Sequence, residues 1–157
     1  MPVSLTPSTR WGTETSLGGM LLAVTDARDA NDLLHRFYTA EFPRSRVASY
    51  AKLVDEAAGN GDRIAQGILC EAAERLAEYA GAVRRQLFEP REPARVSYLG
   101  GVFRSRVVLE RFREAIEAQA GNQLAPPVYG PAAGALLEAY RAAGIACALS
   151  NVPEEKP

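Results

Sequence analysis

The sequence of 157 residues is poor in the residue types that build metal centres and disulfide frameworks. His35 is the only histidine, which excludes most histidine-based metal sites and any triad that needs a second imidazole. Cys70 and Cys147 are the only cysteines, lie far apart in the sequence and belong to no CxxC cluster. We therefore expect free thiols, a reducing compartment and a cytoplasmic location.

Two further features are missing, and each excludes a class of partner. No apolar run reaches the ~18 residues that a membrane-spanning helix requires, and the N-terminus lacks the basic-then-apolar order of a secretory signal. The formal net charge is −1, and the arginines are scattered among glutamates instead of clustering with aromatic residues. We expect no membrane and no nucleic acid as partner.

The composition is that of an ordinary folded protein. Apolar residues make up 47% of the chain and charged residues 24%, and the length is sufficient for one domain with a sizeable core. We expect a single domain over residues 1–157. Residues 1–16 and 150–157 show no apolar period and are expected to be loosely ordered.

Most of the chain shows the apolar period of amphipathic helices. We expect a short helix over residues 17–24, and a second one that Asp29 or Asn31 caps. Ser45 is expected to cap a third helix, which ends near Gly59.

The longest expected helix runs from Asp62 to Phe88, and Asp62 suits its N-terminal end. Its bulky apolar residues recur on one stripe, which we expect to be the buried face. Gly67 and Gly81 share a side of this helix. Either another group approaches closely there, or the side is exposed and unconstrained. The stripe comprises Ile64, Ile68, Ala72, Leu76, Ala80, Val83 and Leu87, and it is widened by Leu69 and Tyr79.

Residues 95–105 change from one kind of element to another within a few positions. Val96, Tyr98 and Leu99 indicate a short buried strand, and the helical period begins at Ser105. Gly100 and Gly101 lie at the junction, where the lack of β-carbons lets a ligand or another backbone approach the main chain. The pair is typical of either a tight turn or a ligand site, and a helix is expected to follow at once.

The last part of the chain is expected to contain a short extended segment and a helix. Residues 124–129 are apolar and contain two prolines, and Pro131 then opens a helix of small residues that ends before Gly144. The bare first turn of this helix suits close packing against a neighbouring backbone.

Several segments together resemble one protein family. The sequences GGVFRS at 100–105 and PPVYGPAAGALLEAYRAAG at 126–144 resemble the C-terminal half of the BadF/BadG/BcrA/BcrD-type ATPases, the family that includes N-acetylglucosamine kinase. Residues 44–58, and Gly61-Asp62 at the start of the long helix, resemble the same family. The resemblance extends from about Trp11 to Gly144.

The resemblance implies a fold and a site. The family belongs to the actin, sugar kinase and heat-shock chaperone superfamily, so we expect a helix-rich α/β fold. It would be a partial ribonuclease-H-like (actin-like ATPase) lobe with few strands and a long central helix. Gly134 and Ala135 match the small pair that lets the last helix pack behind the glycine corner. The implied nucleotide-binding residues are Gly100 and Gly101, against the adenosine and phosphate side, and Val102, Arg104 and Ser105, which can line the base pocket.

The sequence also departs from the family pattern. The Asp-Gly-Gly-Gly-Thr-type phosphate loop, the second phosphate loop and the catalytic aspartate are not found, so no catalytic residue is assigned. We interpret the chain as a fragment or a truncated reading frame, and leave open whether it is an enzyme by itself.

Two functions remain. In the first, the chain is the nucleotide-binding C-terminal lobe of an ATP-dependent sugar kinase or ATPase. The complete protein would use ATP and Mg²⁺ to phosphorylate an amino sugar such as N-acetylglucosamine, which the missing half would bind. In the second, the chain is a non-catalytic helical interaction fragment that binds a partner half or forms a homodimer, because a lobe without its other half exposes a sheet edge and apolar surface.

Overall fold

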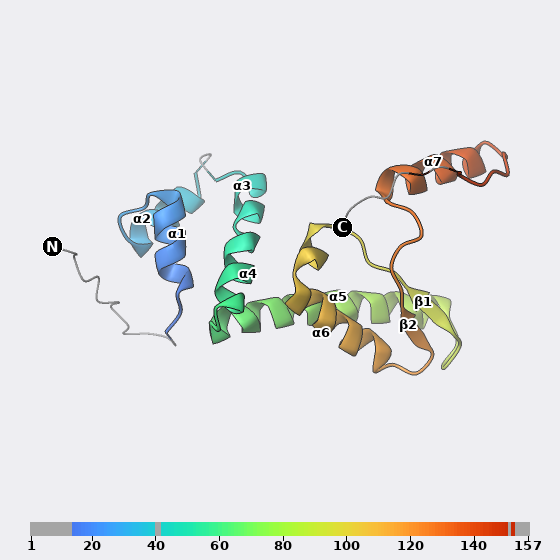
Figure 1. Cartoon of the computed structure of the whole chain (residues 1–157), viewed down its shortest axis with the longest axis horizontal. Coiled ribbons are helices and arrows are strands. Elements are labelled where there is room, and N and C mark those ends of the chain that lie inside the picture. Colours follow the sequence, from blue (N-terminus) through green and yellow to red (C-terminus); the bar gives the residue numbers. More distant parts are fainter. Residues whose placement is uncertain (1–13, 40–41, 151, 153–157) are drawn as a thin grey trace. The chain divides into compact units, whose positions relative to one another are not determined.

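The structure, a computed structural model, describes residues 14–39, 42–150 and 152. Most of the residues expected to be loosely ordered lie outside these ranges. The chain divides into two compact units, residues 1–71 and 72–157. The long helix α5 (Arg63–Leu87) contributes to both units (Figure 1). The expected single domain over residues 1–157 stays a prediction.

Unit 1 is helical in its described residues. It contains α1 (Leu17–Thr25), α2 (Ala30–Phe37), α3 (Arg44–Ser49), α4 (Ala51–Gly59) and the start of α5, and α1 packs against both α2 and α4. The first two helices confirm the sequence prediction, and the Asp29 side chain caps α2 by accepting a hydrogen bond from the Asp32 N–H.

The predicted third helix was wrong in two details. It is divided at Tyr50 into α3 and α4, and Pro43, not Ser45, is the N-cap residue. Pro43 has the extended backbone of an N-cap and cannot continue a helix backwards, so it fixes the start more firmly than a serine two residues later.

Asp62 joins the first helix of unit 1 to α5. Its Oδ1 accepts hydrogen bonds from the N–H groups of Ile64 and Ala65, both at 3.0 Å, as an N-cap residue does. Its Oδ2 accepts from the backbone N–H and hydroxyl of Ser16 and from the Thr15 hydroxyl. These bonds, that of Ala65 first and those of Ser16 next, lower the pKa of Asp62 well below its ordinary value.

Unit 2 is built on a parallel strand pair. β1 (Ala94–Val96) and β2 (Asn122–Leu124) pair in the register Ala94 with Asn122 and Val96 with Leu124. They are connected by a 3₁₀ helix, η1 (Gly101–Arg104), and by α6 (Arg106–Glu117), which packs against both β2 and η1. Figure 1 shows this strand–helix–strand arrangement. Val108, Phe112 and Ile116 on α6 are buried with Ala94 and Leu124 of the strands.

The buried face of α5 differs from the predicted one. Buried residues recur at about every fourth position, and most of them are small, whereas several bulky residues of the predicted stripe are exposed. In unit 2, Val83 and Leu87 retain 54% and 69% of their accessible surface, and Tyr79 retains 70%. Small side chains let α5 approach its neighbours closely, so their stripe is buried in place of the more hydrophobic one. The buried residues are Ala65, Leu69, Ala73, Ala77, Gly81 and Arg84.

Arg84 is charged but lies in this buried stripe, and its hydrogen bonds explain why. Its Nη2 donates to the Glu92 carbonyl at 2.7 Å and to the Ala120 carbonyl at 3.3 Å, and its Nη1 donates to the Glu89 carbonyl at 3.3 Å. One guanidinium thus holds together the turn before β1 and the turn before β2. Burial of the charge is offset because several carbonyl oxygens accept from it.

The helix α7 (Pro131–Ala142) has no buried residue. Pro131 opens it, as predicted, and Gly144 follows its end with a φ of +74°. An irregular segment with bends at Val128 and Tyr129 connects β2 to α7 (Figure 1). A β-carbon built at Gly134 would meet nothing within 4 Å, so the structure shows no close packing of this small residue.

The fold class is thus helix-rich α/β, with a parallel pair of strands in the described residues. The ribonuclease-H-like lobe stays a prediction.

Candidate functional site

The glycine corner follows the carboxyl end of β1. Pairing between the strands continues past the end of β1, because the Ala125 N–H donates to the Val96 carbonyl and the Ser97 hydroxyl donates to the Ala125 carbonyl, both at 3.0 Å. Gly100 then leads into η1. In open parallel sheets, ligands bind beyond the carboxyl ends of the strands, which is where this corner lies.

The two glycines of the corner differ in their backbone requirement. Gly100 has a φ of +109°, a conformation that residues with a β-carbon rarely adopt, so the turn itself requires glycine there. The φ of Gly101 is not positive, and a β-carbon at this position would meet nothing within 4 Å. No contact in the described residues explains a glycine at position 101. Its bare backbone is open to solvent, as a ligand-contacting position would be.

The predicted start of the helical period at Ser105 is confirmed, because Ser105 is the N-cap of α6, but the α-helix does not follow the glycines at once as expected. The four residues of η1 come first, and α6 begins only at Arg106. Phe103 N–H bonds to the Gly100 carbonyl and Ser105 N–H to the Val102 carbonyl, each at 3.2 Å. The 3₁₀ turn thus occupies the positions between Gly100 and Ser105.

The other predicted site residues lie along the same turn. Val102 and Arg104 are exposed, whereas Ser105 is buried and its Oγ accepts a hydrogen bond from the Val108 N–H at 3.4 Å. Ser105 is therefore the N-cap of α6. Its hydroxyl already has this structural role, so the exposed part of the predicted site consists of Gly100, Gly101, Val102 and Arg104.

Sequence reasoning missed an aromatic column next to the corner. The Phe103 ring lies 5.2 Å from the Tyr98 ring and 5.1 Å from the Phe112 ring, measured between centroids. These residues belong to three different segments, so neither a helical nor a strand period connects them. The available signal was only their clustering, with one aromatic residue on each side of the glycine pair.

A concave region of about 390 Å³ lies between α5 and α6, away from the glycine corner. Arg111 is ion-paired there with Glu74 and Glu114, and these contacts, that with Glu74 first, raise the pKa of Arg111 above its ordinary value. The charges of Arg111 and of the two glutamates thus partly neutralise one another. The lining residues are Glu74, Ala77, Glu78, Gly81, Arg85, Arg111, Ala115 and Gln119.

Gly67 and Gly81 of α5 differ in their surroundings. A β-carbon at Gly81 would come within 3.2 Å of Gln119 Nε2, whereas one at Gly67 would meet nothing within 4 Å. Gly81 therefore lies against the end of the flexible Gln119 side chain, and Gly67 lies on an open surface.

The residues that the structure describes contain no group of three or more histidine, cysteine, aspartate or glutamate side chains able to hold a metal ion. None of their helices combines the length and the apolar character needed to cross a membrane. The glycine corner remains the candidate site.

Comparison with known proteins places the chain in a family. The family model described as the BadF/BadG/BcrA/BcrD ATPase family matches residues 7–139. The chain belongs to the BadF/BadG/BcrA/BcrD ATPase family. The matched range contains the long helix α5, both strands, the glycine corner, α6 and most of α7. No curated protein matches the chain. Membership of an ATPase family implies the use of a nucleotide.

Proposed function

We propose that the chain supplies the adenosine-binding side of the nucleotide site in an ATP-dependent sugar kinase or ATPase. The proposal rests mainly on Gly101, because neither its backbone conformation nor its surroundings require a glycine there. In an ATPase family, an open and bare backbone beyond the carboxyl end of a parallel strand suits close approach of a nucleoside.

The surroundings of Gly101 support adenosine over the phosphates. Val102 exposes 43% of its surface next to this glycine and offers apolar contact to a base. Arg104, exposed at the end of η1, can stack its planar guanidinium on a base. The described residues contain no group of three or more acidic, histidine or cysteine side chains that could hold a metal ion by itself. We assign no step to the metal in this chain.

The reaction of the complete protein would be transfer of a phosphoryl group from ATP to a hydroxyl of an amino sugar, N-acetylglucosamine or a related compound. The sugar would be bound by protein outside this chain. The proposal rests on the family resemblance for the substrate and on the glycine corner for the nucleotide.

The test is substitution of Gly101 by valine. We expect Gly101→Val to remain folded, because its β-carbon has open space, and to lose ADP binding, because the side chain occupies the path of the nucleoside. Binding is measured by titrating the isotope-labelled chain with millimolar ADP and following the amide signals, which detects weak association.

Gly67→Val is the matched control. It adds the same side chain at another position with open space, and it should leave ADP binding unchanged. Equal ADP affinity in Gly101→Val and the wild type would exclude the glycine corner as the nucleotide contact. Absence of binding in the wild type would favour the second function.

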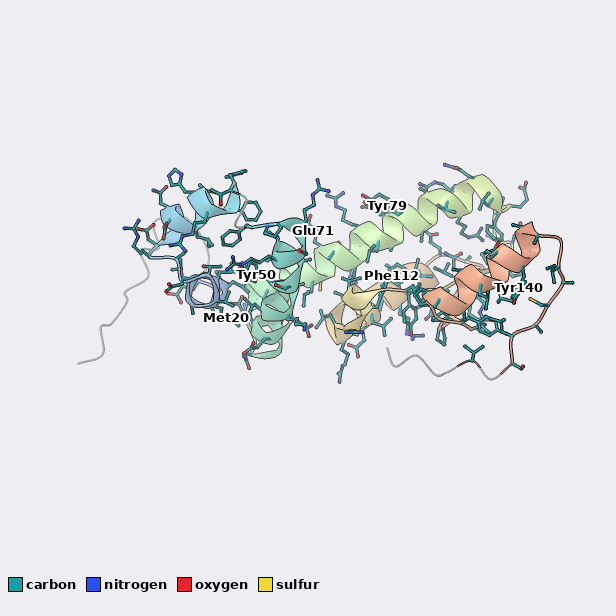
Figure 2. All side chains as sticks on the ribbon, turned by 90° about the horizontal axis from the view of Figure 1, so that it is seen from above. Met20, Tyr50, Glu71, Tyr79, Phe112 and Tyr140 are labelled. Carbon is teal, nitrogen blue, oxygen red and sulfur yellow. The ribbon has the colours of Figure 1, made fainter. Side chains whose placement is uncertain are left out.

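The second candidate function is a non-catalytic fragment that forms a homodimer. Tyr79, Val83 and Leu87 form an exposed apolar stripe on the unit 2 part of α5, and Figure 2 shows Tyr79 on the side of α5 away from α6. The partner would be a second copy, whose α7 covers this stripe. α7 has 12 residues, none of them buried, and a helix of this length is only marginally stable by itself in water.

The two surfaces complement each other in size. The α5 stripe presents bulky side chains, whereas the first turn of α7 carries Ala132, Ala133 and Gly134. We expect Val83→Glu to shift a dimer to monomer in light scattering coupled to size-exclusion chromatography. Gln123→Glu adds the same charge at an exposed position of β2 and should change nothing. A monomeric wild type at high micromolar concentration would exclude this function.

A further inference from the structure

The turn that carries the glycine corner has few contacts of its own. β-Carbons at Gly100 and Gly101 would meet nothing within 4 Å, and Val102 and Arg104 are exposed. Between the end of β1 and the start of α6, the more enclosed side chains are those of Tyr98, Phe103 and Ser105. Besides the two backbone hydrogen bonds of the turn, these three side chains can hold the exposed backbone in one conformation.

Phe103 contacts two other aromatic rings. Its ring lies between the Tyr98 ring, at 5.2 Å and an interplanar angle of 51°, and the Phe112 ring, at 5.1 Å and 57°. Both separations are in the range of interacting aromatic rings, and both pairs are tilted. Phe112 is 4% exposed and belongs to the buried face of α6 (Figure 2). The column thus connects the turn to the core of unit 2.

The aromatic column joins the two ends of the loop that contains the glycine pair. Tyr98 precedes the glycine pair and Phe103 follows it, so contact between the two rings closes the backbone loop that contains Gly100 and Gly101. Gly100 is in a region of φ and ψ that costs conformational entropy to hold, and a 3₁₀ helix of four residues has little stability of its own.

We propose that Phe103 is a positioning residue for nucleotide binding: its ring, held between Tyr98 and Phe112, fixes the Gly100–Gly101 backbone in the conformation that accepts the nucleoside. This inference rests on the proposed nucleotide function. It adds a residue that does not itself touch the nucleotide and acts through preorganisation, because a turn that is already ordered loses less entropy on binding.

Two amides of the turn report its order directly. The Phe103 N–H and the Ser105 N–H are hydrogen-bonded to the carbonyls of Gly100 and Val102. Phe103→Leu keeps an apolar side chain but removes the ring. We expect hydrogen exchange of both amides to become about tenfold faster in this variant, while the amides of Phe112 and Ile116 within α6 keep their rates.

ADP affinity is measured on the same samples by amide-signal titration. We expect Phe103→Leu to weaken ADP binding about tenfold, in parallel with the exchange rates, and Phe103→Tyr to restore both because it keeps the ring. Tyr98→Leu opens the column from its half-buried end and should weaken binding in the same direction. It also provides the test if Phe103→Leu does not fold.

The outcomes separate the inference from the proposed function. Unchanged exchange in both leucine variants would overturn the inference, whatever the wild type binds. Faster exchange with unchanged ADP affinity would also overturn it, because the order of the turn would then not govern binding. A wild type that fails to bind ADP would overturn the proposed nucleotide function, while the exchange rates would still decide whether Phe103 fixes the turn.

Discussion

Individual glycines in this chain are required for different structural reasons. Gly121, just before β2, has a φ of +90°, and a β-carbon there would come within 2.6 Å of the Glu92 carbonyl oxygen and 2.9 Å of Arg84 Nη2. Gly144 has a similar φ of +74° but nothing within 4 Å. The two positions share the backbone cost of an added side chain and differ in the steric cost.

This difference predicts the effect of an alanine at each position. Gly144→Ala should lower the free energy of unfolding by about 1 kcal/mol, the cost of a left-handed backbone. Gly121→Ala should lower it by about 3 kcal/mol or more, because backbone and guanidinium must move as well. Chemical denaturation of both variants measures this. Equal losses would contradict the steric argument.

The contribution of the Arg84 hydrogen bonds to stability can be tested by a conservative substitution. Its guanidinium donates to three carbonyls, whereas a lysine ammonium has a different geometry and cannot span both turns. We expect Arg84→Lys to lower the free energy of unfolding by about 2 kcal/mol in chemical denaturation. Arg85→Lys, at the neighbouring exposed position, should change it by less than about 0.5 kcal/mol.

At the scale of the element, the start of α5 is linked to pH. The hydrogen bonds to Asp62 favour its charged form, so its pKa in the folded chain lies below the ordinary value. Protons therefore bind the unfolded chain more tightly. The stability contributed by this carboxylate is fully present above about pH 4 and is lost as the pH falls from there through the folded pKa.

Asp62→Ala should therefore be less stable than the wild type at pH 6, and the difference should shrink as the pH is lowered below 4. Thermal unfolding followed by circular dichroism between pH 2 and 6 measures both chains under the same conditions. A difference that stays constant over this range would show that the charge of Asp62 does not stabilise the start of α5.

Elements were predictable from sequence where one local signal was strong. The end of α1, the Asp29 cap of α2, the extent of α5 and the proline start of α7 all follow from apolar period and capping residues. β2 lies earlier than the predicted segment over 124–129, because Pro126 and Pro127 lack the N–H that a strand pair needs, whereas Asn122 to Leu124 can pair with β1.

The buried face of α5 could not be predicted in the same way. Hydrophobicity favoured the stripe through Val83 and Leu87, but the neighbours of the helix pack on Ala73, Ala77 and Gly81. Which face is buried depends on what packs against it, and this information lies outside the helix. The aromatic column escaped prediction for the same reason, since Tyr98 and Phe112 meet only after the chain has turned twice.

At the scale of the whole molecule, the two proposed functions predict different dependences of thermal stability. A nucleotide that binds the folded chain raises the unfolding temperature with ADP concentration, whereas a homodimer raises it with protein concentration. Scanning calorimetry over a tenfold range of each separates them. The glycine corner is supported by an ADP effect that disappears in Gly101→Val, and the α5 stripe by a protein-concentration effect that disappears in Val83→Glu.

The Arg84 guanidinium also determines where this chain can be altered by protein engineering. Because one side chain bonds the carbonyls of two turns, those around Glu89–Glu92 and Ala120, lengthening either turn would pull its carbonyls out of reach. A fluorescent tag should therefore be inserted in residues 126–128, which are exposed and irregular between β2 and α7. Insertions at residues 89–92 should instead yield insoluble protein.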